Sequence, residues 1–364
     1  VAAVIVTIML IPQSLAYAML AGLPPEVGLY ASILPLFAYA LLGSSMTLAV
    51  GPVAVISLMT AAAIGPIATP GSPEYLGAAI LLSLLSGVIL MGLGFARAGF
   101  LANLLSHPVI SGFISASAIL IAVSQFKHIL GIPVYGHDMP SILLNLITHL
   151  NETNLPTLII GVSSMIFLFW VRSGLKPQLI KIGMTVAIAR TVAKAGPVMA
   201  VIVSTTIVSF FALHHAGVSI VGVIPDGLPV PSLPEVDLTL ATELLPAAFL
   251  ISIVGFVETV SVGHTLAARR RERIQPNQEL IGLGAANIAS GFGGGFPVTG
   301  GFSRSVVNFE AGAKTPFAGV ITAIMIAMTA LFLTPLFEYL PKAVLAAIVI
   351  VAVLSLVDLK AIHR

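Results

Sequence analysis

The sequence contains no cysteine, and only 8% of its 364 residues are charged. The absence of cysteine excludes disulfides, thiolate metal sites and a cysteine nucleophile. The scarcity of charge excludes a water-soluble globular fold, because such domains carry about 25% charged residues. The formal net charge of +2 gives no indication of a nucleic-acid partner.

What the chain has is apolar sequence: 58% of the residues are hydrophobic and the mean hydropathy is +1.09. This composition predicts an all-α polytopic membrane protein. We expect about twelve apolar segments, with cores near 1–21, 28–43, 50–65, 76–95, 108–130, 155–172, 196–213, 244–266, 279–292, 303–312, 316–336 and 341–357. A helix needs about 20 residues to cross the hydrocarbon, so 50–65 and 303–312 are too short to cross it.

The distribution of Lys and Arg predicts the orientation. If the chain starts inside and its segments alternate, thirteen of the sixteen Lys and Arg residues lie on the inner side, the last of them Lys360 and Arg364. Only Lys127 and Lys342 fall on the outer side, as the positive-inside rule requires. We expect a bacterial inner membrane, with the basic cluster from Arg269 to Arg273 in the cytoplasm. This cluster is interpreted as a topology anchor, and the alternative is a lipid-headgroup site.

The two short segments share one pattern. Residues 46–65 and 296–316 each have an extended, β-branched or Gly-rich lead-in, followed by a short helix that begins in mid-membrane. Paired interrupted segments point to the central site of an inverted-repeat transporter. Because seven segments separate them, we predict a seven-plus-seven inverted repeat. The first repeat would span about 1–213 and the second about 244–364, with the last two segments missing from a fragment that lacks both ends.

Local signals indicate where the two half-helices begin and end. Pro52 suits the first turn of the first half-helix, where a missing N–H costs nothing. In the second, we expect Thr299 or Ser303 to cap the N-terminus and Gly312 to end the helix.

The two half-helix N-termini and Arg304 together predict an anion site. Each N-terminus carries roughly half a positive charge and free N–H groups. Arg304 lies in the first turn of the second half-helix, where a cation opposes the helix dipole and the membrane makes charge costly. Such a cost is understandable if the site receives an anion. The alternatives are that Arg304 pairs with Glu258 or extends to water.

Two other segments carry polar side chains in apolar surroundings. Gln13 and Tyr17 are four residues apart, so they share a helix face and can both donate to an anion, or else bond a neighbouring helix. Glu258 is the only acid in the middle of a full-length span, which is a functional hypothesis by default, often a proton or cation relay. No nucleophile or metal motif is present, so we expect no enzyme, no cofactor and no metal.

Several stretches together resemble the sulfate permease family (SulP), whose animal branch comprises the solute-carrier anion exchangers. The resemblance covers essentially the whole chain, and the matching stretches are PQSLAYAMLAGLPPEVGLYASILPLFAYALLGSS (12–45), VGPVAVIS (50–57), SHPVISGF (106–113), FVETVSVG (256–263) and GGFSRSVVNFEAGAKTPFAG (300–319).

This resemblance implies a fourteen-helix inverted repeat, divided into core and gate domains, with the anion between the third and tenth segments. It also implies that Glu258 couples transport to protons or sodium, that a cytoplasmic STAS domain is missing here, and that the full-length protein is a homodimer. The residues that it assigns to the substrate are Gln13, Tyr17, Val53, Ala54, Phe302, Ser303 and Arg304.

We therefore predict secondary active transport of an inorganic anion, with sulfate as the leading substrate and a proton as the coupled ion. The alternatives are a sodium-coupled bicarbonate carrier, a chloride or dicarboxylate exchanger, a nucleobase carrier of the same fold, and a passive anion channel. The predicted partners are the anion, the coupled proton or sodium, and the lipid bilayer.

Overall fold

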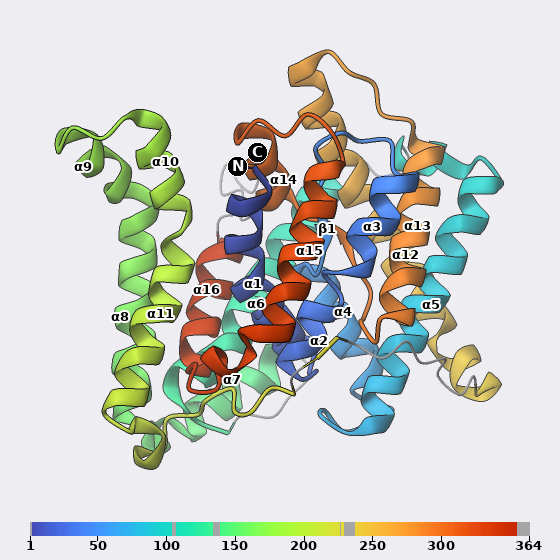
Figure 1. Ribbon diagram of the computed structural model, residues 1–364. Coiled ribbons are helices and arrows are strands. Elements are labelled where there is room, and N and C mark those ends of the chain that lie inside the picture. Colours follow the sequence, from blue (N-terminus) through green and yellow to red (C-terminus); the bar gives the residue numbers. More distant parts are fainter. Residues whose placement is uncertain (1, 104–106, 134–138, 226, 229–236, 355–364) are drawn as a thin grey trace. The chain divides into compact units, whose positions relative to one another are not determined.

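The computed structural model describes residues 2–103, 107–133, 139–225, 227–228 and 237–354 (Figure 1). The chain forms two compact units. Unit 1 comprises Val1–Ile110 and Gly227–Phe332, and unit 2 comprises Ser111–Asp226 and Leu333–Arg364. Each unit therefore combines parts of both predicted repeats. Lys360, Arg364 and Ser106, the first residue of the 106–113 motif, lie outside the described residues.

Unit 1 contains nine of the described α-helices and two short strands. The helices are α1 (Ala2–Leu20), α2 (Pro25–Tyr30), α3 (Leu34–Leu42), α4 (Ala54–Ile64), α5 (Pro73–Phe95), α12 (Leu238–Arg270), α13 (Pro276–Phe292), α14 (Phe302–Glu310) and α15 (Phe317–Phe332). The strands are β1 (Val50–Gly51) and β2 (Thr299–Gly300), and a 3₁₀ turn covers Ala98–Asn103.

Unit 2 contains the remaining described helices. They are α6 (His107–Leu130, which begins in unit 1), α7 (Met139–Thr148), α8 (Leu155–Trp170), α9 (Lys176–Lys181), α10 (Val186–Lys194), α11 (Gly196–Phe210) and α16 (Lys342–Leu354). A π-helical turn, Val171–Leu175, joins α8 to α9, and 3₁₀ turns cover Leu150–Glu152, Leu213–Ala216 and Thr334–Phe337.

Helix starts follow the expected capping chemistry in several places. The Ser72 side chain accepts a hydrogen bond from Tyr75 N (3.1 Å), and Pro73 occupies the first position of α5. Asp237 caps α12 by accepting from Thr239 N (2.8 Å). Because of this cap, α12 begins earlier than the apolar run at 244 predicts.

The core of unit 1 forms where α5 packs against α12 and α13. Its largest fully buried side chains include Tyr75, Phe256 and Phe296. The helices α5 and α13 approach closely at Gly87 and Gly284, because a Cβ on Gly87 would lie 2.8 Å from the Gly284 carbonyl oxygen. Small residues allow such close packing between helices in membranes, where burial of apolar surface does not drive association.

In the described residues, each predicted apolar segment contains helix. In the described part of the chain, five helices are long and apolar enough to cross a membrane, or six if Ile188–Lys194 and Gly196–Phe210 form one bent span. The segments predicted at 50–65 and 303–312 are helices of 11 and 9 residues. The segment predicted at 28–43 is divided into α2 and α3, and the second of these has Pro35 in its first turn.

Candidate functional site

The lead-ins to the two half-helices lie side by side in unit 1. Strands β1 and β2 pair in antiparallel fashion, with Val50 opposite Gly300 and Gly51 opposite Thr299. Gly301 N donates a further hydrogen bond to the Ala49 carbonyl (3.1 Å). Because α4 and α14 begin immediately after these strands, the pairing brings their N-termini to one place.

The half-helix starts differ in detail from the predicted caps. The N-cap residues are Val53 for α4 and Gly301 for α14, and neither helix has a side-chain cap. The prediction of a Thr299 or Ser303 cap is therefore wrong. Pro52 precedes α4 and does not lie in its first turn, because the chain is still extended at Val53. The N–H groups of both first turns consequently have no side chain capping them.

Polar side chains of α12 and α13 fix the lead-in of α14. The Thr299 hydroxyl donates to the Gly255 carbonyl (2.7 Å) and bonds the Thr259 hydroxyl (2.7 Å), which also accepts from Gly300 N (3.0 Å). The Asn287 amide accepts from Val298 N (2.9 Å) and donates to the Val298 carbonyl (2.9 Å). Neighbouring helices thus satisfy the broken backbone, which membrane depth requires.

The lead-in of α4 depends on α14 itself. The Ser305 hydroxyl accepts from Ala49 N (2.9 Å), and the Asn308 amide donates to the Thr47 carbonyl (3.0 Å). Both side chains are buried. The first half-helix therefore takes its position from the second, and the second takes its position from α12 and α13.

Arg304 occupies the junction between the two half-helices. Its side chain is 2% exposed, and Nη1 donates to the Pro52 carbonyl (2.5 Å). Nε and Nη2 find no hydrogen-bond partner among the described residues. A Cβ on Gly301 would lie 2.8 Å from Nη2, so a side chain at that position would displace the guanidinium. This region thus contains a buried positive charge with unused donors.

Glu258 of α12 and Tyr17 of α1 lie near this junction. Helix α12 packs against α4, β2 and α14, and α1 packs against α4 and α14. Tyr17 and Glu258 are both close enough to Arg304 to interact with its charge. The hydrogen bond of Arg304 nevertheless goes to Pro52 and not to Glu258, which does not favour the ion-pair alternative. Gln13 and Tyr17 are buried and Glu258 is half-buried.

The other predicted site residues line the two helix starts. Val53 and Ala54 are buried, with exposed fractions of 8% and 2%. Phe302 is 45% exposed, and Ser303 is also exposed. All eight predicted residues belong to unit 1. Val53, Ala54, Phe302, Ser303 and Arg304 lie at the starts of α4 and α14, and Tyr17 and Glu258 lie near the charge of Arg304.

Sequence reasoning missed the residues that position this site. One signal was available for Asn308: it lies four residues after Arg304, so the two polar side chains share a face of a helix. Thr259 is adjacent to Glu258, but its partners Thr299 and Gly300 are distant in the sequence. Asn287 gave no signal, because its partner at Val298 is a backbone group.

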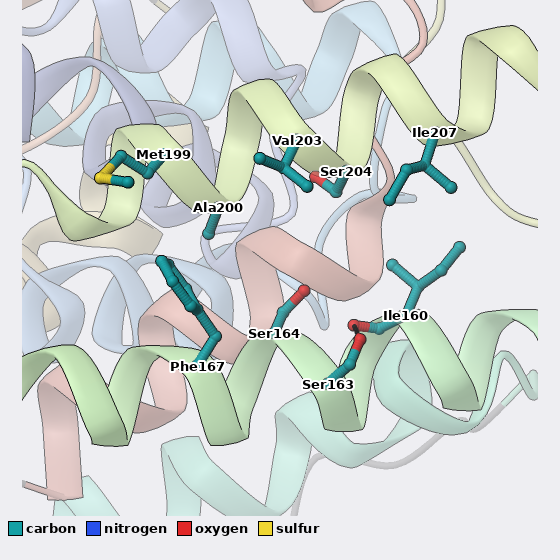
Figure 2. A pocket seen from close by; sticks show the side chains of 9 residues that line it. All are labelled: Ile160, Ser163, Ser164, Phe167, Met199, Ala200, Val203, Ser204 and Ile207. Carbon is teal, nitrogen blue, oxygen red and sulfur yellow. Dashed lines mark hydrogen bonds between the residues drawn. The ribbon is translucent and has the colours of Figure 1, made fainter.

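A cavity in unit 2 lacks the chemistry that an inorganic anion requires. It has a volume of about 220 Å³, and Figure 2 shows α8 and α11 facing each other across it. The described residues that line it carry no charge and are Ile160, Ser163, Ser164, Phe167, Met199, Ala200, Val203, Ser204 and Ile207. In the described part of the chain, no group of three or more His, Asp or Glu residues could hold a metal ion.

Comparison with known proteins identifies a family and a fold. The model of the sulfate permease family matches residues 1–364. Sulfate transporter 4.1 (chloroplastic) of Arabidopsis thaliana is 42% identical over 359 residues, which cover 98% of this chain and 51% of that protein. The chain therefore spans about half the length of this curated relative.

Two solved structures resemble the chain closely. The murine Solute Carrier 26 family member A9 anion transporter, in its inward-facing state, has a TM-score of 0.85 and 28% identity, covering 98% of this chain and 60% of that one. The transmembrane domain of the cyanobacterium bicarbonate transporter BicA has a TM-score of 0.85 and 22% identity, covering 99% and 88%. These matches confirm the seven-plus-seven inverted-repeat transporter fold.

Proposed function

The chain belongs to the sulfate permease family, and from this premise we propose that it transports an inorganic anion, with sulfate as the leading substrate. The name of its plant relative supports sulfate. The proposed mechanism is secondary active transport across a bacterial inner membrane, by a protein that is a homodimer at full length. As a member of a permease family, the chain is a transport protein and not an enzyme.

The observation that carries this proposal is that Arg304 is buried while its Nε and Nη2 have no hydrogen-bond partner among the described residues. A guanidinium has five N–H donors and cannot be deprotonated in practice. Leaving such a group buried without partners costs several kcal/mol, and a matching anion offsets that cost. Sulfate suits the position because its oxygens can accept from Nε and Nη2 as a pair. The uncapped first turns of α4 and α14 offer further N–H donors.

The remaining residues have complementary roles in this proposal. Val53 and Ala54 are small enough for the anion to approach the backbone of α4, and Ser303 supplies a hydroxyl at the start of α14. Gln13 and Tyr17 donate from α1, and Phe302 covers the site from the exposed side. The anion would then be held by donors from three helices, with one fixed positive charge.

Glu258 is proposed to couple transport to a proton. A dianion that enters a negative-inside cell moves against about 2.3 kcal/mol per charge per 100 mV, so Arg304 alone cannot drive accumulation. The Glu258 carboxylate lies close enough to Arg304 to offset its charge. Protonation of Glu258 as the anion binds would remove this offset, strengthen the positive field and carry one proton with the substrate.

Uptake of labelled sulfate into proteoliposomes tests the proposed function. The wild-type protein should take up sulfate, and Arg304→Ala should lose at least about 90% of this uptake because the charge and the paired donors are gone. Arg269→Ala is the matched control, because Arg269 is exposed at the end of α12. Wild-type uptake by a folded Arg304→Ala protein would rule out this site. Unlabelled bicarbonate, chloride and a dicarboxylate, added as competitors, rank the alternative substrates.

The same vesicles test the coupling. Glu258→Gln imitates the protonated carboxyl, so this variant should still exchange sulfate across the membrane. It should not concentrate sulfate when the outside is acidified, whereas wild type should. If Glu258→Gln still accumulates sulfate after the pH step, Glu258 is not the coupling group. A sodium gradient at equal pH distinguishes sodium coupling from proton coupling.

A further inference from the structure

A second concentration of positive charge lies in unit 2, around a cavity of about 400 Å³. The described residues that line it are Lys127, His128, Gly131, Ile132, Pro133, Ser219 and Lys342. They come from the last turn of α6 and the residues after it, from the segment after the 3₁₀ turn Leu213–Ala216, and from the first residue of α16. A backbone hydrogen bond joins Ser219 to α16: Lys342 N donates to the Ser219 carbonyl (2.9 Å).

The charges at this cavity come from distant parts of the sequence. Lys127 and Lys342 are the only two Lys or Arg residues that the sequence predicts on the outer side, and both line the same cavity. Their positive charges both act on the His128 ring. Of the described residues that line the cavity, none is acidic. Two ammonium groups and an imidazole therefore share one space, with no carboxylate from the described part of the lining.

Helix dipoles explain only part of this arrangement. Lys127 and His128 lie in the last turn of α6, where cations are favourable. Lys342, in contrast, is the first residue of α16, where a cation opposes the helix dipole. Lys342 also adds repulsion toward the other two groups. The position of Lys342 is thus unfavourable for the isolated protein, and an anion in the cavity would reverse that balance.

We propose that this cavity is a second anion site, which binds an oxyanion of the sulfate or phosphate type. Two ammonium groups supply a charge of +2 that matches a divalent oxyanion, and the N-terminal turn of the 13-residue helix α16 adds its dipole. The oxyanion is either a dissolved ion or the phosphate of a lipid headgroup, because both present the same oxygens to the lysines. The site is separate from Arg304, which belongs to unit 1.

Lysine footprinting of the purified protein tests this site. The full chain, in neutral detergent, is treated with an amine-acetylating reagent at increasing sulfate, with chloride at matched ionic strength as the reference. Mass spectrometry then gives the modification rate of each lysine. We expect sulfate to slow modification of Lys127 and Lys342 at least 3-fold, and to leave Lys176 and Lys181 of α9 unchanged. A second arm replaces sulfate with nanodiscs of phosphatidylglycerol, compared with phosphatidylcholine, to identify a headgroup as the source.

Two sets of variants make the outcome decisive. In Lys127→Gln, sulfate should no longer protect Lys342, because one ligand needs both ammonium groups; the Lys181→Gln control should keep that protection. Protection should persist in Arg304→Ala, which distinguishes this site from the proposed transport site. The proposal is overturned if neither sulfate nor phosphatidylglycerol protects the two lysines, if Lys176 and Lys181 are protected equally, or if protection disappears in Arg304→Ala.

Discussion

Glu279 and Arg304 are both buried in unit 1, and their hydrogen bonding differs. Glu279 is 1% exposed, and its carboxyl accepts hydrogen bonds from the Tyr39 hydroxyl (2.7 Å), Ser44 N (2.8 Å) and Ser45 N (3.0 Å). Arg304 is 2% exposed, and two of its three guanidinium nitrogens have no partner among the described residues. The chain thus supplies hydrogen-bond donors to both carboxyl oxygens of Glu279, whereas among the described residues it supplies no acceptor to Arg304 Nε and Nη2.

The difference supports different roles for the two groups. Glu279 lies in α13 and fixes the turn that follows α3, so its hydrogen bonds stabilise the fold. The chain is thus able to satisfy a buried charged group completely when only folding matters. The unused donors of Arg304 cost stability in the absence of a ligand, which is expected of a group reserved for binding. Substitutions at the two positions should therefore affect different measurements.

The largest expected effect is the loss of stability in Glu279→Leu. This change leaves the Tyr39 hydroxyl and two backbone N–H groups buried without an acceptor, which should lower the free energy of unfolding by at least about 3 kcal/mol. Thermal unfolding in detergent measures it, with Glu272→Leu as the exposed control. The remaining folded protein should bind sulfate with wild-type affinity. A stable Glu279→Leu protein with impaired binding would reverse the roles that we assign.

The next effect concerns the first half-helix. Ala54→Leu places a large side chain where the anion approaches the backbone of α4, and should weaken sulfate binding at least about 100-fold, or about 2.8 kcal/mol. Overpacking should also lower stability by about 1–3 kcal/mol, so binding is measured on folded, monodisperse protein. Ala62→Leu, at an exposed position of the same helix, and the smaller change Ala54→Ser should both bind normally. Normal binding by Ala54→Leu would remove α4 from the site.

A third substitution, at Arg304, should raise stability and not lower it. Arg304→Met replaces the unpaired charge with an apolar side chain of similar length, and should raise the thermal stability of the ligand-free protein by roughly 1–2 kcal/mol. Sulfate should stabilise wild type more than Arg304→Met, because a ligand stabilises only a folded state that binds it and the variant lacks the site at Arg304. Stabilisation through the cavity of Lys127 and Lys342 would be the same in both proteins. A loss of stability comparable with that of Glu279→Leu would mean that Arg304 is a structural residue.

The smallest effect is expected at Ser303. Ser303→Ala removes one exposed hydroxyl from the start of α14, and a single hydrogen bond contributes about 0.5–1.5 kcal/mol. Sulfate binding should weaken about 2–10-fold, and thermal stability should not change, because Ser303 does not cap the helix. A stability loss without a change in affinity would show that the hydroxyl acts on the fold alone.

The sequence predicted the two half-helices because their length and their Gly and Pro content differ from those of the other segments. It also predicted that Arg304 lies at the start of the second one. It did not predict that the lead-ins pair as β1 and β2, because two-residue strands carry no periodic pattern. The wrong cap at Thr299 has a related cause: the Thr299 hydroxyl bonds Gly255 and Thr259, two residues of α12 that are distant in sequence.

Glu279 was beyond sequence reasoning for a physical reason. It stands at the start of an apolar run. An acid at such a position normally lies at the N-terminus of a helix, where it contacts water and is stabilised by the helix dipole. Its burial depends on Tyr39, Ser44 and Ser45, which lie more than 230 positions earlier in the chain. The spacing of residues within one helix does not contain that information.

The central claim is that an oxyanion binds between the starts of α4 and α14, with Arg304 as its charged partner. An anomalous difference map from crystals grown in selenate, which replaces sulfate, tests it most directly. We predict a selenium peak at a position from which the selenate oxygens accept hydrogen bonds from Arg304 Nε and Nη2 and from the first-turn N–H groups of both half-helices. The absence of a peak there, with a selenate peak elsewhere in the molecule, would contradict the account.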